Sequence, residues 1–315
     1  MVFKASESYL PVYPQFVEIT QKHERVHWGE WEVKLDSDVE DWRLDRLSKQ
    51  EKTFISSVLR LFTQSDVAVA GDYYDNLIPV IKNNEARNML GSFAAREGTH
   101  QRAYALLNDT LGKGEAFYLE FNKFREMKDK IEWMMNVKND SPRNVALGIA
   151  KQVMGEGVML FGIFALLLNL QRRGLLLGMG DVNQWSIRDE SIHVEGLGAL
   201  FHVIVGENPE IVDDAFKAEI YEMAREVVKL EDAYIDLIFS DGSSEGATAE
   251  DTKQYVRAMC DYRMTQLGFK EQFGAKNPYT WLSWLLSGNT IENFFENNTV
   301  GYSKDSMEGT YAGGY

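Results

Sequence analysis

The sequence of 315 residues contains a single cysteine, Cys260. One thiol cannot form an internal disulfide, and it excludes a zinc site built from several thiolates. We expect Cys260 to be a buried thiol, because free cysteine packs as a small apolar residue. The start of the chain also lacks the basic segment, apolar core and cleavage site of a secretion signal. We therefore expect the protein to be cytoplasmic.

Proline and basic residues are also scarce. The six prolines leave long stretches without a helix breaker, a composition suited to long helices. Acidic residues outnumber basic ones 48 to 33, which gives a formal net charge of −15. Nucleic-acid binding requires clustered lysine and arginine. We therefore expect no nucleic-acid partner.

One uncharged apolar run, residues 157–168, is bracketed by Glu156 and Asn169. A helix needs about 20 apolar residues to cross a bilayer. This run is shorter, and a helix that is apolar on all sides is typical of a protein core. We expect a buried helix here and no membrane partner.

Apolar residues recur at spacings of three and four, without an extended alternation of the strand type, so the sequence predicts an all-α protein. In each of four predicted helices a carboxylate lies on the apolar face, and two of these helices also carry a histidine there. An unpaired charge inside a core costs several kcal/mol. These groups must therefore meet one another or a cation. The four helices lie at about 55–73, 84–112, 145–167 and 190–204, and two more are expected at about 211–239 and 249–270.

Two of the helices carry the motif Glu-x-x-His, at residues 97–100 and 190–193. A separation of three residues places both side chains on one face of a helix, where they can bind one metal ion. Each motif follows a helix with one core-facing carboxylate, so the arrangement occurs twice, as a four-helix bundle with a two-metal centre requires. The predicted ligands are Asp66, Glu97, His100, Glu156, Glu190 and His193.

The other histidines are expected to be structural. A third Glu-x-x-His, at residues 24–27, has no core-facing carboxylate about 30 residues before it and lies near Pro14 in a stretch expected to be irregular. A lone motif of this kind is weak evidence for a ligand. We assign no metal to it, and none to His23 or His202.

Four carboxylates and two imidazoles form an oxygen-rich ligand set, which suits iron or manganese better than structural zinc. We expect two ions per chain and redox chemistry. Tyr104 lies four residues after His100 and projects from the same helix face. Its position next to an oxidising metal pair favours a redox role, with simple core packing as the alternative.

In combination, these motifs resemble the small, radical-generating β subunit of class I ribonucleotide reductase. The resemblance implies a ferritin-like helical bundle that forms a homodimer. It also implies that the activated metals oxidise Tyr104 or hold the oxidising equivalent themselves. That equivalent passes to a cysteine in a separate catalytic α subunit. The matching residues are Asp66, Glu97-x-x-His100-x-x-x-Tyr104, Glu156, Arg188-Asp189-Glu190-x-x-His193 and Asn293-Phe294-Phe295-Glu296.

The same resemblance assigns further residues. Trp28 and Asp189 match positions at which the family connects a tryptophan through an aspartate to a metal-bound histidine. The glycine-rich end of the chain is similar to a tail that docks on the α subunit, with Tyr311 or Tyr315 as the radical relay. We therefore expect an irregular N-terminal region (1–48), a ferritin-like helical domain (49–290) and a flexible tail (291–315).

The sequence departs from the family around Glu156, with Gly155, Leu160 and Gly162, and again at Val194-Glu195. These changes leave the metals open as di-iron, di-manganese or a mixed Mn/Fe pair, and they leave the tyrosyl radical on Tyr104 open. Two other functions also remain, a self-contained di-metal oxidase or monooxygenase and a ferritin-like metal store. The single cysteine favours the subunit, because ribonucleotide reduction needs several thiols.

Overall fold

A computed structural model describes residues 1–282, and within them the regular structure is helical, without a β-sheet. Residues 1–279 form one unit. Short 3-10 turns and two π turns, η2 (Tyr73–Leu77) and η4 (Gly155–Met159), connect or extend the helices. The α-helices are α1 (Pro14–Arg25), α2 (Asp36–Arg43), α3 (Lys49–Asp72), α4 (Asn84–Thr110), α5 (Glu115–Leu119), α6 (Arg125–Met135), α7 (Pro142–Met154), α8 (Leu160–Arg172), α9 (Leu177–Glu207), α10 (Asp214–Asp241) and α11 (Ala249–Gln266).

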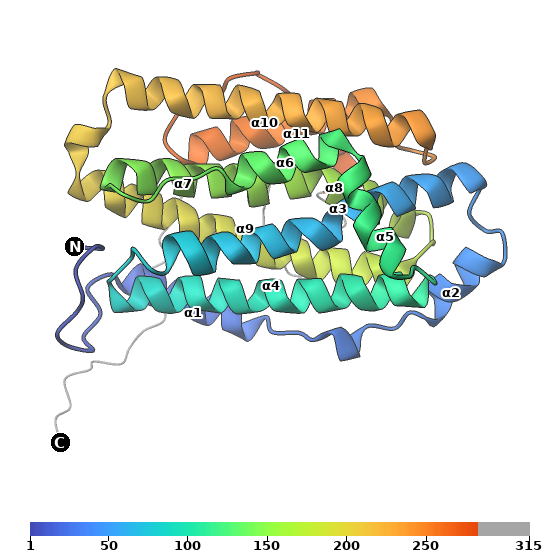
Figure 1. Ribbon diagram of the computed structural model, residues 1–315, viewed down its shortest axis with the longest axis horizontal. Coiled ribbons are helices and arrows are strands. Elements are labelled where there is room, and N and C mark those ends of the chain that lie inside the picture. The colour runs from blue at the N-terminus through green and yellow to red at the C-terminus, as the bar shows by residue number, and fades with distance from the viewer. Residues whose placement is uncertain (283–315) are drawn as a thin grey trace. The chain divides into compact units, whose positions relative to one another are not determined.

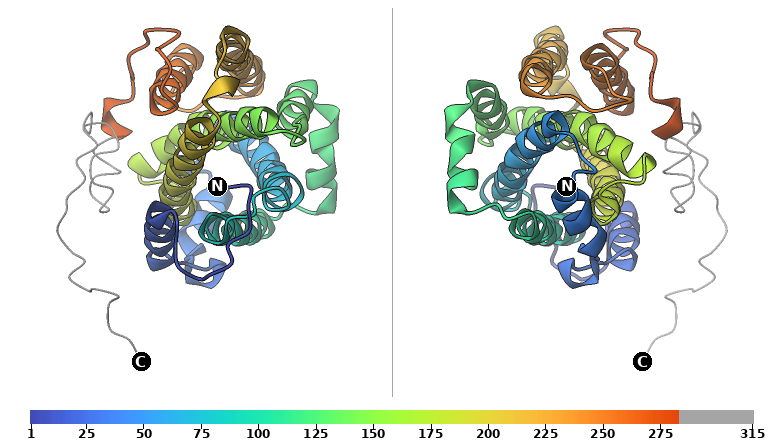
Figure 2. Two further views of the ribbon diagram at one scale, coloured as in Figure 1. Left: turned by 90° about the vertical axis from the view of Figure 1, so that its left-hand side faces the viewer. Right: turned by 90° about the vertical axis from the view of Figure 1, so that its right-hand side faces the viewer.

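The four predicted carboxylate-bearing helices pack together. Helix α3 lies against α4, and α9 lies against α4, α7 and α8 (Figure 1). On one side of this bundle α10 packs against α11 and α6, while α1 covers α4 and α9 on another side (Figure 2). The interior between α3, α4, η4 and α9 is therefore enclosed by protein.

Side-chain caps fix several helix starts where the sequence provides them. Ser48 accepts the backbone N–H of Glu51, whose carboxylate accepts the N–H of Ser48 in return. Asn83 caps α4 by accepting the backbone N–H of Ala86 with its side-chain oxygen, and α4 ends before Gly112, which has a φ of +73°. Thr248 caps α11 by accepting the backbone N–H of Asp251.

Residues 1–48, expected to be irregular, contain the helices α1 and α2. Pro14 stands in the first turn of α1, where a missing N–H is harmless. One face of α1 then buries Phe16, Ile19 and His23 at spacings of three and four. The prediction of irregular structure at Pro14 was therefore wrong. The expected tail, 291–315, lies outside the described residues.

The most apolar stretch, Pro142–Arg172, is long and apolar enough to cross a membrane by length and composition alone. Its most apolar window is entirely buried inside the protein, as expected of a core helix. Cys260 is also buried, as predicted, with its thiol 3.8 Å from the carbonyl oxygen of Ala224.

Candidate metal centre

All six predicted ligands are buried inside the bundle. Five of them fall into two potential metal-binding groups, and Asp66 belongs to neither group. Asp66 comes from α3, Glu97 and His100 from α4, Glu156 from η4, and Glu190 and His193 from α9. None of their side chains is more than 1% exposed. Potential ligand atoms of Glu97, His100 and Glu190 lie within 4.8 Å of one another, and so do those of Glu156, Glu190 and His193. Two adjacent groups of ligands thus share Glu190.

Glu97 and Glu190 each face both histidines, with one carboxylate oxygen toward each. The Nδ1 atom of His100 lies 3.4 Å from Glu97 Oε2 and 3.3 Å from Glu190 Oε1. The Nδ1 atom of His193 lies 3.1 Å from Glu97 Oε1 and 3.2 Å from Glu190 Oε2. Glu156 approaches only His193, at 3.4 Å. Two central carboxylates with a histidine at either end have the form of a bridged two-metal site.

Several buried polar atoms of this cluster have no hydrogen-bond partner among the described residues. They belong to Asp66 (Oδ2), Glu97 (both oxygens), Glu190 (Oε2) and His193 (Nδ1). An unsatisfied buried polar atom costs about 1–3 kcal/mol, and more for a charged group. Divalent cations would satisfy these atoms. The oxygen and imidazole donors fit iron or manganese, so the residues present suit the expected two-metal group.

The electrostatics of the cluster are those of crowded carboxylates balanced by imidazoles. Burial and the neighbouring Glu97 raise the pKa of Asp66 well above its usual range, and burial raises the pKa of Glu156 to about 8. Burial also opposes the charge on Glu97, but His100 and His193 outweigh it and lower the pKa of Glu97 to about 2. The carboxylates in turn raise the pKa of both histidines despite burial. Metal ions would compete with protons for these ligands.

The second nitrogen of His100 faces a chain of hydrogen bonds that leads toward the N-terminal region. Its Nε2 lies 3.2 Å from Asp189 Oδ2, which accepts from Trp28 Nε1 at 2.7 Å and from Arg96 at 2.8 Å. Although burial opposes the charge, His100 and Arg96 hold the pKa of Asp189 well below its usual range. An anionic Asp189 thus orients the His100 ring. The structure brings Trp28 and Asp189 together, as the resemblance implied.

Tyr104 is fully buried beside the cluster. Its hydroxyl donates to Asn183 Oδ1 at 3.0 Å and lies 3.5 Å from Ser186 Oγ, and its ring stacks on Phe62 at 4.5 Å between centroids. Burial and the Asp66 carboxyl raise its pKa well above the usual value, so the phenol keeps its proton. Tyr311 and Tyr315 lie outside the described residues.

Sequence reasoning missed residues that touch the ligands. His23, assigned a structural role, is buried on α1 with its Nε2 3.2 Å from Nε2 of His193. Burial and the charge of His193 lower the pKa of His23 to about 2, so its ring is neutral. Tyr73, seven residues after Asp66 on the same face, donates to Glu156. The spacing of seven residues from Asp66 was the sequence signal that could have identified Tyr73 as a neighbour of the cluster.

The other histidines singled out in the sequence lie away from the cluster. His202 is exposed and lies 2.8 Å from the carbonyl oxygen of Gln266. Neither Glu24 nor His27 belongs to a potential metal-binding group among the residues described.

The family model described as "Ribonucleotide reductase, small chain" matches residues 8–278. The probable ribonucleoside-diphosphate reductase small subunit 376L of Invertebrate iridescent virus 6 is 35% identical, over 99% of this chain and 98% of its own length. The probable small subunit 048L of Invertebrate iridescent virus 3 is 37% identical, over 95% of this chain and 84% of its own.

Solved structures show the same fold. A putative class I ribonucleotide reductase from Bacillus halodurans matches with a TM-score of 0.81 and 18% identity, over 86% of this chain and 99% of its own. The dimanganese(II) NrdF of Streptococcus sanguinis matches with a TM-score of 0.77 and 19% identity, over 87% of this chain and 95% of its own. The Rnr4 homodimer of Saccharomyces cerevisiae matches with a TM-score of 0.76 and 18% identity, over 89% of this chain and 88% of its own. These likenesses confirm the predicted ferritin-like helical fold.

Proposed function

Because the chain belongs to the ribonucleotide reductase small-chain family, which makes it a subunit of an oxidoreductase, we propose that it is the radical-generating β subunit of a class I ribonucleoside-diphosphate reductase. In this role it works with a separate catalytic α subunit and starts ribonucleotide reduction there. The chain itself has one buried thiol, whereas the reduction consumes several.

The observation that carries the proposal is the pairing of Glu97 and Glu190 with both histidines at the heart of the bundle. One ion would be held by Asp66, Glu97, His100 and Glu190, and the other by Glu156, Glu190, Glu97 and His193. When bound, two iron or two manganese ions, or a mixed pair, supply the oxidising equivalent. The protein encloses this chemistry in a buried site that excludes water.

Tyr104 is the residue proposed to be oxidised. Its buried phenol is held by Asn183 and packed against Phe62, so a radical on its ring is shielded from solvent. The identity of the metals determines whether the equivalent rests on Tyr104 or on the ions.

The Trp28, Asp189 and His100 chain is the proposed route out of the centre. Asp189 stays ionised and accepts hydrogen bonds from Trp28 and Arg96, so it can hold the indole and the imidazole in a fixed relation. From Trp28 the equivalent passes to Tyr311 or Tyr315 on the tail that docks on the α subunit. The subunit is proposed to act as a homodimer, the form named for the yeast structural relative. Its proposed location is the cytoplasm.

An activity assay with and without an added α subunit tests the proposal. We expect ribonucleoside-diphosphate reduction only with both chains, and loss of that activity after truncation behind Tyr302. Substrate oxidation by this chain alone would instead support a self-contained oxidase. Reduction that survives the truncation unchanged would contradict the tail's role.

Electron paramagnetic resonance with metal quantitation identifies the radical store. A tyrosyl signal beside iron would place the oxidising equivalent on Tyr104, and its loss in Tyr104→Phe would assign it. A high-valent manganese signal that persists in Tyr104→Phe would place it on the metals.

A further inference from the structure

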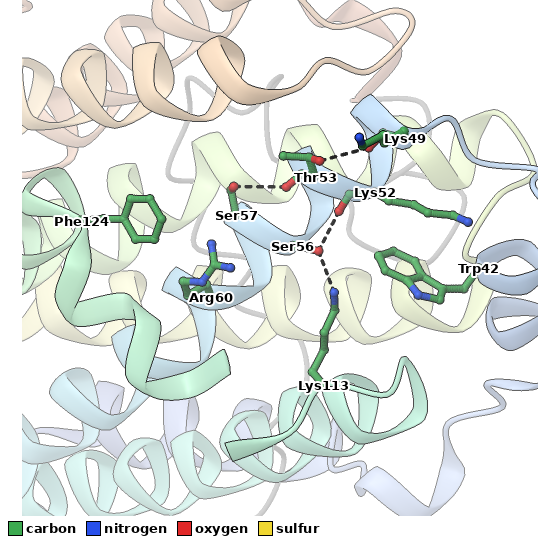
Figure 3. Close-up of a pocket in the computed structure, with 9 residues that line it drawn as sticks. All are labelled: Trp42, Lys49, Lys52, Thr53, Ser56, Ser57, Arg60, Lys113 and Phe124. Carbon is green, nitrogen blue, oxygen red and sulfur yellow. Dashed lines mark hydrogen bonds between the residues drawn. The ribbon is translucent and has the colours of Figure 1, made fainter. Parts of the chain in front are cut away.

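A pocket of about 390 Å³ lies along the first half of α3, and none of the proposed metal ligands lines it (Figure 3). Its walls come from α2, α3, the segment after α4 and the residue before α6. Trp42 and Phe124 supply aromatic surface. Four of the lining side chains are cationic: Lys49, Lys52, Arg60 and Lys113.

Nearby acids compensate this charge only in part. Arg60 pairs with Glu120 at 2.9 Å, and Lys52 lies 3.5 Å from Asp45, whose side chain is 94% exposed. Within residues 1–282, neither Lys49 nor Lys113 forms an ion pair. In a chain with a net charge of −15, four cations around one pocket, two of them without an ion pair among the described residues, do not follow from composition.

The two innermost cations are held in place partly by aromatic rings. The Arg60 guanidinium lies 4.7 Å from the ring centroid of Phe117 and 5.1 Å from that of Phe124, and the Lys113 ammonium lies 4.7 Å from that of Trp42. The Arg60 side chain is 11% exposed, and its buried Nε has no hydrogen-bond partner among the described residues. The Lys113 ammonium donates to Ser56 Oγ at 2.8 Å, as Figure 3 shows. Burial and the charge of Arg60 lower the pKa of Lys113. Two half-buried like charges are stabilised when an anion lies between them.

We propose that this pocket binds a phosphate-bearing anion, with its oxygens contacted by Arg60 and Lys113. A guanidinium matches a phosphate through parallel N–H donors, and a lysine ammonium adds a point charge. Lys49 and Lys52 extend the positive surface toward solvent. The volume falls in the range of small-molecule sites, so free phosphate, pyrophosphate and a nucleotide phosphate chain all fit the chemistry.

Calorimetric titration of the full-length protein with inorganic phosphate, pyrophosphate and a nucleoside triphosphate tests the proposal and identifies the source. We expect saturable binding of at least one anion, weakened about tenfold or more by Lys113→Gln, which keeps a donor for Ser56. Lys49→Gln, an exposed change, should weaken it in the same direction. The control Lys217→Gln removes a lysine of α10 that is outside the pocket and pairs with Asp214.

The proposal is overturned if all three anions bind more weakly than about 1 mM. It is equally overturned if Lys113→Gln and Lys49→Gln both bind like the unchanged protein. Should Lys113→Gln fail to fold, Lys49→Gln decides alone.

A separate observation concerns the two π turns. Tyr73 is the first residue of η2, and Glu156 lies in η4. The Tyr73 hydroxyl donates to Glu156 Oε2 at 3.0 Å, and its ring lies 6.2 Å from that of His193. Single π turns inside helices occur frequently at functional sites. Here two of them bring a buried phenol to a carboxylate of the cluster.

Glu156 is restrained in a way that the central carboxylates are not. Gln152 Nε2 donates to its other oxygen at 2.6 Å, so both oxygens of Glu156 accept a hydrogen bond. Both oxygens of Glu97 lack a partner among the described residues. Burial and Glu156 raise the pKa of Tyr73 well above its usual value, so the phenol remains a donor.

We infer that Tyr73 is a positioning residue that orients Glu156 toward the ion on the His193 side, an inference that rests on the proposed two-metal centre. Partners that orient a ligand typically change metal affinity 10–100-fold when removed. Tyr73→Phe deletes only the hydroxyl. Tyr234→Phe is the matched control, because Tyr234 is also fully buried and donates to the carbonyl oxygen of Ser57.

Titration of metal-free protein with Mn²⁺, followed by electron paramagnetic resonance, distinguishes a failure of the role inferred for Tyr73 from a failure of the proposed function. We expect two bound ions in the unchanged protein and in Tyr234→Phe. In Tyr73→Phe one ion should bind about tenfold more weakly or worse, and the signal of the coupled pair should fall. Gln152→Met, which removes the other donor to Glu156, should act in the same direction and decides the matter if Tyr73→Phe does not fold. Unchanged affinity in the variants refutes the role of Tyr73, whereas an unchanged protein that binds no pair refutes the proposed function.

Discussion

The indole nitrogen of Trp28 donates to Asp189 Oδ2 over 2.7 Å, although 161 positions separate the two residues in the chain. The same carboxylate oxygen lies 3.2 Å from His100 Nε2, and the Trp28 ring stacks on the His100 ring at 5.8 Å between centroids. The N-terminal region is thereby tied to the proposed metal centre through one ionised carboxylate.

Trp28→Phe tests whether this connection carries the radical. The change keeps an aromatic ring against His100 but removes the donor to Asp189, so we expect two ions to remain bound while reduction in the presence of the α subunit is abolished. The control is Trp31→Phe, because the Trp31 side chain is 71% exposed and lies three residues away. Metal analysis and the two-subunit assay are the measurements. Full activity of Trp28→Phe would contradict the proposed route.

Replacement of Glu97 or Glu190 by alanine tests the ligand assignment. Each carboxylate faces both histidines, so we expect its loss to abolish binding of at least one ion. Glu195→Ala, on the same helix as Glu190 but exposed and paired with Lys22, should leave two ions bound. Elemental analysis of the purified variants is the measurement. Two ions still bound by Glu97→Ala and Glu190→Ala would refute the assignment.

The sequence predicted the central bundle well because its signals are local. A carboxylate and a histidine three residues apart share a helix face in any α-helix, and the cap Asn83 and the terminator Gly112 mark the ends of α4. That the faces of four helices meet was inferred from the cost of buried charge. The structure brings five of the six side chains into two potential metal-binding groups, and the sixth, Asp66, is buried close enough for the charge of Glu97 to raise its pKa.

The contacts that escaped prediction depend on packing between segments that lie far apart in the sequence. His23 follows a short apolar stripe in α1 that is buried only because α1 docks on α4 and α9. Spacing places Tyr73 on the same helix face as Asp66, but its hydrogen bond to Glu156 depends on how two distant helical segments pack, which spacing alone could not show. The scarcity of proline indicated long helices, yet it did not reveal that Pro14 begins one.

Cys260 provides a test of the packing on the far side of the bundle. Burial raises the pKa of its thiol to about 12, and the side chain is fully enclosed. Because the thiolate is the reactive form, we expect no modification by iodoacetamide at pH 8 in the native protein and full modification in denaturant. Mass spectrometry of the alkylated chain measures this. Rapid labelling of the native protein would show that α10 and α11 separate readily.

The buried ion pair of Lys130 and Glu231 yields a prediction about stability. Its charged atoms lie 2.5 Å apart, and the two side chains are 2% and 1% exposed. Lys130→Met leaves Glu231 buried without a counter-ion, so we expect a loss of about 3–5 kcal/mol in the free energy of unfolding, measured by urea denaturation of the full chain.

Burial raises the pKa of Glu231 even with Lys130 present. A raised pKa in the folded state makes stability fall as pH rises, so the loss should be larger at pH 8 than at pH 5. The double variant Lys130→Met/Glu231→Leu should recover most of the stability, because it buries no charge. The control Lys253→Met breaks the more exposed pair with Asp236 and should cost about 0–1 kcal/mol. A loss in Lys130→Met no greater than in this control would show that Glu231 reaches water or another partner.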